Sequence, residues 1–255
     1  MTNDIGNYAK HAQIWDWGGY ERIEEFEYWC KYAKPFGNHV LMPFCALGET
    51  GAYMARKGFT VTAFDITPEM IEEGEKRFGN VDGLRLYISD VTDFCFDISP
   101  ADFCFASDFG HIHTLTDVKK ALSCINRHLR EGGALVIETG LPYKESGYYP
   151  PKTFYPKEHV YPDKKVWKTG DTRNDAETGR CYISQTVFIE DMAGCVEQFE
   201  HAFYLQCYSR DIWISALLEF GFRIQNEFRN REKEQWINND GYWIVEAIKK
   251  EGVKT

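Results

Sequence analysis

Short apolar runs alternate along most of the chain with segments whose apolar residues recur every three or four positions. The first pattern is typical of buried parallel strands and the second of amphipathic helices. Strands and helices that alternate in this way predict a parallel sheet wound with right-handed crossovers. The expected strands are residues 39–44, 60–66, 84–90, 101–109, 134–140, 222–228 and 241–250, and the expected helices are residues 52–58, 67–78, 116–133 and 209–222.

Two segments depart from this alternation. Residues 1–38 include the amphipathic pattern YERIEEFEYWCKYA and are expected to form an N-terminal helical segment. Residues 142–208 begin with a stretch rich in proline, tyrosine and lysine that is typical of irregular structure, whereas 180–191 and 195–208 are β-rich with a hairpin-like separator. We therefore expect one α/β domain of residues 1–255. It has a doubly wound, mostly parallel seven-stranded sheet, an antiparallel last strand, and a small antiparallel insertion that acts as a lid.

The composition narrows the class of protein further. The 255 residues are 44% hydrophobic, which is sufficient for one sizeable α/β core. The net charge of −10 argues against a nucleic-acid partner, because an acidic surface repels phosphates. We see neither a secretory leader nor an apolar run of about 20 residues, so no membrane association is expected. The eight cysteines are scattered without C-x-x-C spacing, which indicates reduced thiols in a cytoplasmic protein.

Candidate ligand-binding residues lie where the first three expected strands end. In an open parallel sheet, ligands bind at the carboxyl ends of strands, where the strand order reverses. The first strand leads into a turn with Gly48, Thr50 and Gly51, where the backbone can approach a ligand. The second strand ends at Asp65, which can accept both hydroxyls of a ribose, and the third ends at Asp90, followed by a valine. The glycine turn is also compatible with an ordinary strand–helix turn, and each acid with a helix cap or a solvated strand end, but three such features in order are less expected by chance.

These features resemble the class I S-adenosylmethionine-dependent methyltransferases. The family motif V-L-(D/E)-x-x-C-G-x-G, followed by A-x-x-G-x-x-V-x-G-x-D-x-S-x-x-M, is similar to the sequence from V-L-M-P-F-C-A-L-G to F-D-I-T-P-E-M here. The resemblance covers about residues 8–140. It implies S-adenosylmethionine as cofactor, S-adenosylhomocysteine as product and methylation of a small molecule at nitrogen or oxygen. The residues that it places around the cofactor are Cys45, Ala46, Gly48, Glu49, Thr50, Gly51, Asp65, Ile66, Met70, Asp90, Val91, Ser107 and Asp108.

The first motif departs from the family pattern. Met42 occupies the position of the usual acidic residue, while Phe44 and Ala46 replace small or glycine residues in a longer turn. The loop around the methionine end of the cofactor is therefore expected to differ from that of the family. Glu49 is a candidate for the missing carboxylate.

By the same resemblance, the loop after the fourth strand borders the transferred methyl group. This loop contains His111 and His113, and either can serve as a general base for an acceptor that must lose a proton. A metal site is the less favoured alternative, because the sequence nearby contains no obvious third ligand, so we expect no bound metal. The remaining alternative is that both histidines cap the next helix.

Aromatic residues outside the core pattern are candidates for the substrate pocket. Methyl transfer from a sulfonium mainly requires alignment of the reactants and exclusion of water. We expect the pocket wall to contain Trp15, Trp17 and Tyr20 from the N-terminal segment and Tyr149 and Trp167 from the insertion. Such a wall in an acidic protein favours a cationic or aromatic substrate. The alternative is that these side chains only pack the insertion onto the core.

Two other functions share part of this pattern. An NAD-dependent oxidoreductase has the same kind of sheet and a ribose-binding acid, but the glycine spacing here is not G-x-G-x-x-G. A non-catalytic S-adenosylmethionine-binding module would retain the fold and tolerate the altered first motif. A test of which cofactor binds distinguishes the oxidoreductase from a methyltransferase. A turnover assay distinguishes the binding module from an active enzyme.

Overall fold

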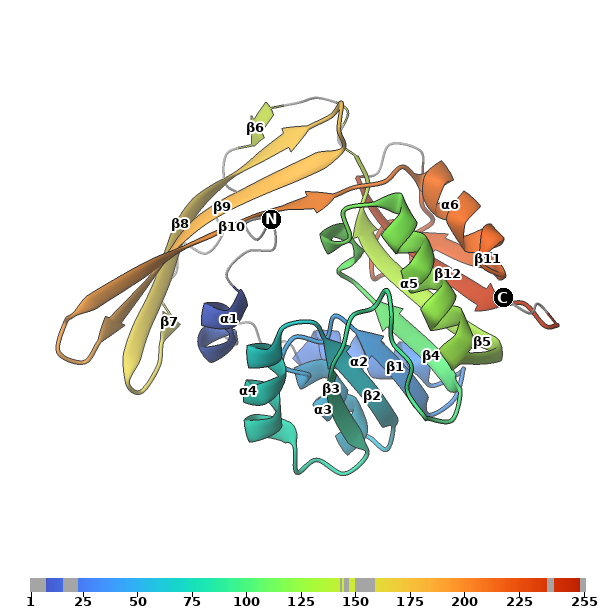
Figure 1. Ribbon diagram of the computed structural model, residues 1–255, viewed down its shortest axis with the longest axis horizontal. Helices are drawn as coiled ribbons and strands as arrows, with labels where there is room; N and C mark the ends of the chain where they lie inside the picture. Colours follow the sequence, from blue (N-terminus) through green and yellow to red (C-terminus); the bar gives the residue numbers. More distant parts are fainter. Residues whose placement is uncertain are drawn as a thin grey trace.

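A seven-stranded sheet forms the centre of the computed structural model, which describes residues 8–15, 23–142, 144, 147–149, 159–237 and 241–252, with the backbone alone at 147–149 and 159. The strand order is β3-β2-β1-β4-β5-β12-β11 (Figure 1). The strands are β1 (His39–Pro43), β2 (Thr60–Asp65), β3 (Leu84–Ile88), β4 (Ala101–Ala106), β5 (Leu129–Gly140), β11 (Phe222–Phe228) and β12 (Tyr242–Lys249).

The strand directions agree with the predicted fold class. Strands β1 to β5 pair in parallel, whereas β12 is antiparallel to both β5 and β11. The chain builds outward from β1 to β3 and then returns to β4 on the other side of β1. The doubly wound, mostly parallel sheet with an antiparallel last strand is therefore confirmed. Its switch point lies at the carboxyl ends of β1 and β4, where ligands bind in folds of this kind.

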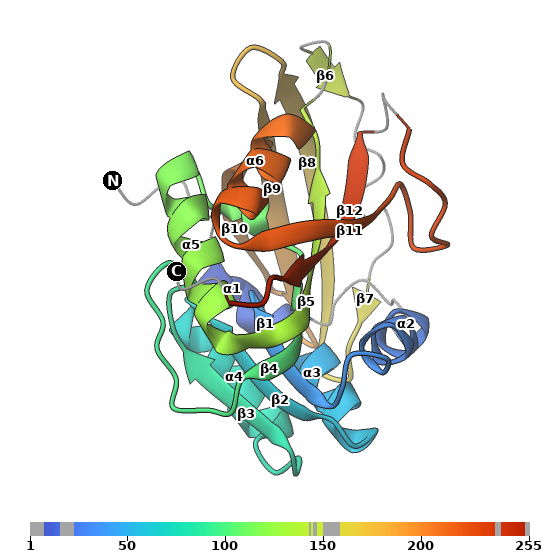
Figure 2. The same cartoon turned by 90° about the vertical axis from the view of Figure 1, so that its right-hand side faces the viewer.

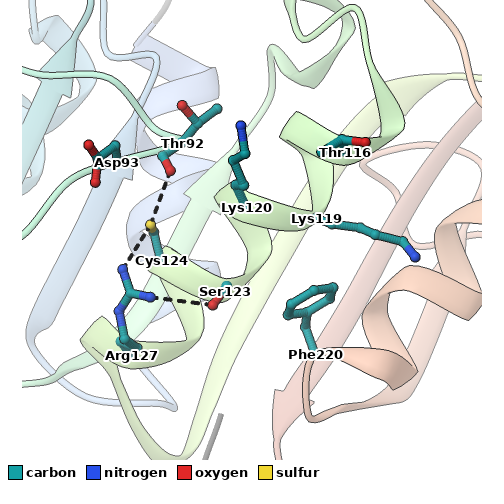
Figure 3. Close-up of a pocket in the computed structure, with 9 residues that line it drawn as sticks. All are labelled: Thr92, Asp93, Thr116, Lys119, Lys120, Ser123, Cys124, Arg127 and Phe220. Atoms are coloured by element: carbon teal, nitrogen blue, oxygen red, sulfur yellow. Dashed lines mark hydrogen bonds between the residues drawn. The ribbon is translucent and has the colours of Figure 1, made fainter.

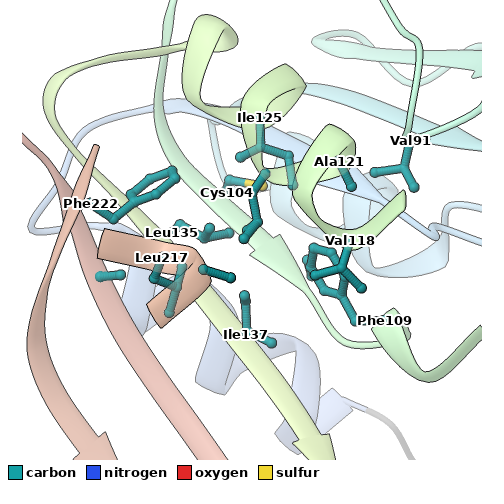
Figure 4. Close-up of a cluster of buried hydrophobic side chains, with 14 of the residues drawn as sticks. Val91, Cys104, Phe109, Val118, Ala121, Ile125, Leu135, Ile137, Leu217 and Phe222 are labelled. Carbon is teal, nitrogen blue, oxygen red and sulfur yellow. The ribbon is translucent and has the colours of Figure 1, made fainter. Parts of the chain in front are cut away.

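Helices cover both faces of this sheet because alternate strand residues are apolar. On one face, Leu135 and Ile137 of β5 pack with α5 and α6 (Figure 4). On the other face, Ala134 and Val136 pack with α2, α3 and α4. The helices are α1 (Tyr8–His11), η1 (Ala12–Ile14), α2 (Ile23–Ala33), α3 (Glu49–Arg56), α4 (Pro68–Phe78), η2 (Phe109–His111), α5 (Leu115–His128) and α6 (Arg210–Glu219). None of the helices in the described ranges is long and apolar enough to cross a membrane.

Helix α5 ends at His128, whereas the sequence pattern predicted that it continues through a glycine pair to residue 133. Leu129 is buried and pairs with Ala101 of β4, so the chain is already in β5 there. Gly132 has a φ of +71°, and a Cβ on Gly133 would lie 3.2 Å from the carbonyl oxygen of Ala101. The glycine pair therefore allows β5 to pass close to β4 at an irregularity in their register.

The insertion after β5 forms a separate antiparallel sheet, called the insertion sheet below. Its long strands extend over α1 (Figures 1 and 2). The predicted β9–β10 hairpin is confirmed, but β8 was missed within the stretch expected to be irregular. One face of β8 carries Lys168, Gly170 and Thr172 after Val166, so the apolar alternation that marks a strand is weak. The strands are β6 (Gly147–Tyr149), β7 (His159–Val160), β8 (Lys164–Asp175), β9 (Arg180–Asp191) and β10 (Val196–Gln206).

Candidate active site

A cavity of about 530 Å³ lies at the carboxyl ends of β1, β2, β3 and β4. Helix α1 and the loop that contains η2 complete its wall, so segments far apart in the sequence meet there. It is located at the switch point of the sheet, where the fold predicts a ligand site. The lining residues are Tyr8, Trp15, Phe44, Ala46, Phe64, Asp65, Ile66, Thr67, Met70, Ser89, Asp90, Val91, Thr92, Asp108, His111, Ile112, His113 and Asp117.

Asp65 is fixed at the end of β2 by two backbone hydrogen bonds. Its Oδ1 accepts a hydrogen bond from the amide of Thr67 at 3.0 Å, and its Oδ2 accepts one from the amide of Ala46, also at 3.0 Å. Burial raises the pKa of Asp65, and the carboxylate of Asp108 contributes in the same direction. A carboxylate held in this way retains lone pairs for further donors, as binding of two ribose hydroxyls requires.

The end of β3 combines an oriented acid with an apolar surface. One oxygen of Asp90 accepts hydrogen bonds from both the amide and the hydroxyl of Thr92, each at 2.8 Å. Val91 is buried beside it, whereas Ile66 lines the same cavity with 57% of its surface exposed. An exposed isoleucine in a cavity provides an apolar contact for a flat ring such as adenine.

The turn after β1 has a strained backbone at the positions where the motif departs from the family pattern. Phe44 and Ala46 have φ values of +56° and +50°, in the left-handed region that glycine adopts without a steric penalty. Gly48 has a φ of +81°, and a Cβ on it would lie 2.6 Å from Leu86 Cδ2. The altered motif therefore retains the turn geometry without two of the small residues that favour it.

Several predicted cofactor residues are placed behind the cavity wall rather than in it. Cys45 is half-buried in the turn, and its thiol donates to the carbonyl of Ala46 at 3.6 Å. Gly51 packs α3 against β2 and β3, since a Cβ there would meet Leu84 and Val61 at 3.1 and 3.2 Å. The lining does not include Cys45, Gly48, Glu49, Thr50, Gly51 and Ser107, but it includes Ala46, Asp65, Ile66, Met70, Asp90, Val91 and Asp108.

His111 forms a pair with Tyr8 across the cavity. The Tyr8 hydroxyl lies 3.0 Å from Nε2 of His111, and the two rings meet edge to face. Burial lowers the pKa of His111 to about 4, so its imidazole is neutral at physiological pH. Its Nδ1 is buried and has no hydrogen-bond partner in the part of the chain that the structure describes. Tyr8 was not predicted as a site residue, and no motif around it distinguishes it from the other tyrosines.

His113 is held by the insertion sheet. Its Nε2 donates to the carbonyl oxygen of Tyr204 at 3.1 Å, and its ring stacks on the Tyr204 ring at 3.8 Å. Both predicted histidines line the cavity, but their surroundings differ. Of these two histidines, His111 has a buried ring nitrogen without a partner among the described residues, whereas His113 has no such atom.

The structure places the predicted aromatic wall only in part. Trp15 lines the cavity beside Tyr8, with ring centroids 6.2 Å apart. Trp167 lies on the face of β8 opposite to the buried Val166 and stacks on Phe188 at 5.2 Å, so it does not reach this cavity. Trp17, Tyr20 and the side chain of Tyr149 lie outside the described residues.

Acidic side chains dominate the charge of the cavity. Four carboxylates line it, from Asp65, Asp90, Asp108 and Asp117, and no lysine or arginine is among the described lining residues. Asp117 is paired with Lys120 outside the lining, so the other three carboxylates determine the charge of the wall. A wall of one sign in a partly enclosed site concentrates ligands of the opposite charge. The cavity therefore favours cations over anions. The described residues contain no group of three His, Cys, Asp or Glu side chains arranged to hold a metal.

A second hollow, of about 420 Å³, lies on the solvent side of α5 (Figure 3). Its cations have partners within the protein: Lys119 pairs with Glu219 at 2.7 Å, and Lys120 pairs with Asp117 at 2.8 Å. The guanidinium of Arg127 donates to Cys124 Sγ at 3.0 Å. Both lysines are therefore neutralised by carboxylates, which leaves the hollow little to attract an anionic ligand, so the cavity at the strand ends is the better candidate.

Comparison with known proteins shows what the segment that contains these strand ends is similar to. Residues 40–133 match the family model described as a methyltransferase domain. The methyltransferase-like protein YqeM of Bacillus subtilis is 23% identical over 134 residues, which cover 51% of this chain and 54% of that protein. The chain therefore spans about half the length or less of the curated relatives that it matches.

Solved structures extend the similarity to the whole fold. A S-adenosylmethionine-dependent methyltransferase from Clostridium acetobutylicum is 16% identical with a TM-score of 0.73, covering 95% of this chain and 99% of that one. The sugar N-methyltransferase KedS8 from Streptoalloteichus is 15% identical with a TM-score of 0.71, covering 98% and 96%. The chain therefore has the fold of the class I S-adenosylmethionine-dependent methyltransferases, and its residues 40–133 match a methyltransferase domain. The resemblance predicted from the sequence is confirmed.

Proposed function

We propose that this protein transfers a methyl group from S-adenosylmethionine to an amine nitrogen of a small molecule. The observation that carries the proposal is the neutral His111, paired with Tyr8, in a cavity lined by four carboxylates. The fold similarity to a sugar N-methyltransferase is consistent with an amine acceptor. The cofactor supplies an electrophilic methyl group on a cationic sulfonium.

The cavity residues suit S-adenosylmethionine in shape and charge. Asp65 would accept the ribose hydroxyls, while Ile66 and Val91 would contact the adenine ring, with Asp90 at its amino edge. The acidic lining attracts the cationic donor more strongly than the neutral product sulfur. Together these contacts fit the cofactor. The product is released more easily because its sulfur no longer carries the positive charge of the sulfonium.

The opposite end of the cavity suits an amine. An amine arrives largely as an ammonium ion, which the exposed carboxylate of Asp108 attracts, and it must release a proton to solvent before its lone pair can attack. In the tautomer whose Nε2–H donates to the Tyr8 oxygen, Nδ1 of the neutral His111 can then accept a hydrogen bond from the amine N–H and orient the lone pair. Methyl transfer depends chiefly on such alignment, which can contribute several kcal/mol to lowering the barrier. His111 and Tyr8 are therefore assigned to orientation, and His113 to support of the loop.

The insertion sheet is proposed to act as a lid. Phe203 of β10 lies 5.3 Å from His111 and 5.8 Å from Tyr8 between ring centroids, so the sheet contacts both members of the pair. A lid in this position would exclude water from the transfer. The acceptor is then enclosed between the loop after β4 and the insertion sheet.

A non-catalytic binding module is the second candidate function. The strained turn at Phe44 and Ala46 favours it, because this turn borders the cofactor end of the cavity. Such a module would bind S-adenosylmethionine without turnover. An NAD-dependent oxidoreductase is disfavoured by the match to a methyltransferase domain.

The test combines binding with turnover. Isothermal titration with S-adenosylmethionine, S-adenosylhomocysteine and NADH identifies the cofactor. Release of S-adenosylhomocysteine is then measured with 2-amino-2-deoxyglucose, cyclohexylamine and cyclohexanol as acceptors. Turnover of an amine supports the proposal, and turnover of the alcohol alone contradicts it. Tight binding without turnover of any acceptor supports the binding module.

A further inference from the structure

Buried polar atoms without partners gather beneath the insertion sheet. Among the described residues, eight such side-chain atoms occur, and four of them belong to His11, His111, Thr172 and Asn174. A buried polar atom without a hydrogen bond reduces stability, and each instance requires an explanation. His111 belongs to the site described above. Thr172 and Asn174 lie two positions apart on β8, outside that site.

Thr172 and Asn174 lie on the face of the insertion sheet that is turned to the core. The pairing of β8 with β9 is continuous, so alternate residues share a face with the fully buried Val166. Their cross-strand partners, Ile183 and Cys181, are buried as well. The opposite face holds Arg173, whose guanidinium lies over the Tyr182 ring. The unpartnered oxygens are therefore on the inner side of the sheet.

The same inner face leads directly to the Tyr8–His111 pair. Ile183 is the cross-strand partner of Thr172 on β8 and of Phe203 on β10, so these residues form one row across three strands. Phe203 contacts the rings of both Tyr8 and His111. Neighbouring strands are about 4.8 Å apart, which places Thr172 about 10 Å from Phe203 along the row. One small ring compound can span that distance.

We propose that Thr172 and Asn174 form a subsite for the hydroxyl groups of the acceptor. The Thr172 hydroxyl can donate and accept, and the unpartnered Asn174 Oδ1 accepts, so a neutral hydroxyl group suits both. Asn174 is only 2% exposed, so its polar group is costly unless a ligand satisfies it. The acceptor is therefore a hydroxylated amine, with the amine at His111 and hydroxyls beneath β8. This subsite rests on the proposed amine methylation.

Two variants remove the polar atoms while keeping the side-chain volume, Thr172→Val and Asn174→Leu. Each should lower kcat/KM for 2-amino-2-deoxyglucose about five- to tenfold through KM, and leave cyclohexylamine, which lacks hydroxyls, nearly unaffected. The Kd for S-adenosylhomocysteine should not change, and the melting temperature should not fall. Thr169→Val, at an exposed position on the opposite face of β8, is the matched control and should behave as wild type. Equal losses with both amines, or none, would overturn the subsite.

A binding measurement separates this subsite from the proposed reaction. Ligand-detected NMR on the protein loaded with S-adenosylhomocysteine reports binding of 2-amino-2-deoxyglucose without turnover. If the wild type binds this compound and both Thr172→Val and Asn174→Leu weaken the binding, the subsite is supported. Binding of this kind without any methyl transfer would overturn amine methylation but leave the subsite in place. Absence of binding by wild type, or equal binding by both variants, overturns the subsite.

Discussion

The hydroxyl oxygen of Tyr8 lies 3.0 Å from Nε2 of His111, although the two are 103 positions apart in the sequence. The contact joins α1 to the loop after β4, so the N-terminal helix is part of the cavity wall. It also occupies one nitrogen of the imidazole, and the buried Nδ1 has no partner within the described ranges. This arrangement determines which side of His111 an acceptor can approach.

The first prediction is that Tyr8 and His111 act as one unit. Tyr8→Phe removes only the hydroxyl, and His111→Phe removes both ring nitrogens, so each should lower kcat roughly 10- to 100-fold with an amine acceptor. The double variant should be little worse than His111→Phe, because coupled residues are not additive. Affinity for S-adenosylhomocysteine, measured by titration, should stay within about twofold of wild type. Fully additive losses in kcat would show that the two residues act independently.

The second prediction concerns Asp65→Ala. Loss of a charged acceptor for two hydroxyls should cost about 1.5–3 kcal/mol of S-adenosylhomocysteine affinity. The free energy of unfolding should also fall by about 1–3 kcal/mol, since the amides of Ala46 and Thr67 lose their acceptor. Urea denaturation measures the second effect. Asp97→Ala, at an exposed acid outside the cavity, should change neither quantity, and an unchanged Kd in Asp65→Ala would refute the ribose assignment.

The strand ends of the site could be predicted from the sequence, because each is a local feature. Asp65 and Asp90 follow short apolar runs, and parallel strands bring their carboxyl ends to one edge of the sheet. Tyr8 could not be predicted, because its contact with His111 depends on the path of the N-terminal segment. No spacing in the sequence encodes that path.

The insertion was predicted less completely, for a different reason. Its hairpin was recognised, but the polar inner residues of β8 weaken the alternation that identifies a strand. Trp167 was assigned to the cavity by residue type alone. The register of β8 with β9 places it on the opposite face, beside Phe188. In a two-residue repeat, a shift of one position reverses the face, and composition cannot determine it.

The third prediction is that stability decreases in mild acid. His11 and His201 stack at 4.0 Å between α1 and β10, and burial lowers their pKa values to about 3 and about 4. Protonation of His11 is disfavoured further by His201 and Lys168, and protonation of His201 by Lys168 and His111. The ordinary histidine pKa is about 6.5 in the unfolded chain, so below that pH the unfolded state binds protons that the folded state excludes.

The stability from this pair should thus be fully present above about pH 6.5 and lost progressively toward pH 4. Between pH 6.5 and pH 5, each histidine should account for about 2 kcal/mol of lost unfolding free energy. Urea denaturation at pH 7, 6 and 5 measures how the free energy of unfolding changes with pH, and this slope gives the number of protons taken up on unfolding. His11→Phe and His201→Phe should each reduce that number by about one. A variant that keeps the wild-type slope would exclude its histidine as a source.

The last prediction is that Ala46→Gly stabilises the protein. Ala46 has a φ of +50°, and the left-handed backbone costs a non-glycine residue about 1–2 kcal/mol. Glycine removes this cost, but its added flexibility in the unfolded chain lowers the free energy of unfolding by about 0.5–1 kcal/mol. The net gain in unfolding free energy should be about 0.5–1 kcal/mol, with S-adenosylhomocysteine affinity equal to or tighter than wild type. Ala52→Gly, inside α3, is the control and should lose about 1 kcal/mol or more. Destabilisation by Ala46→Gly would show that its methyl group contributes more packing than the backbone strain costs.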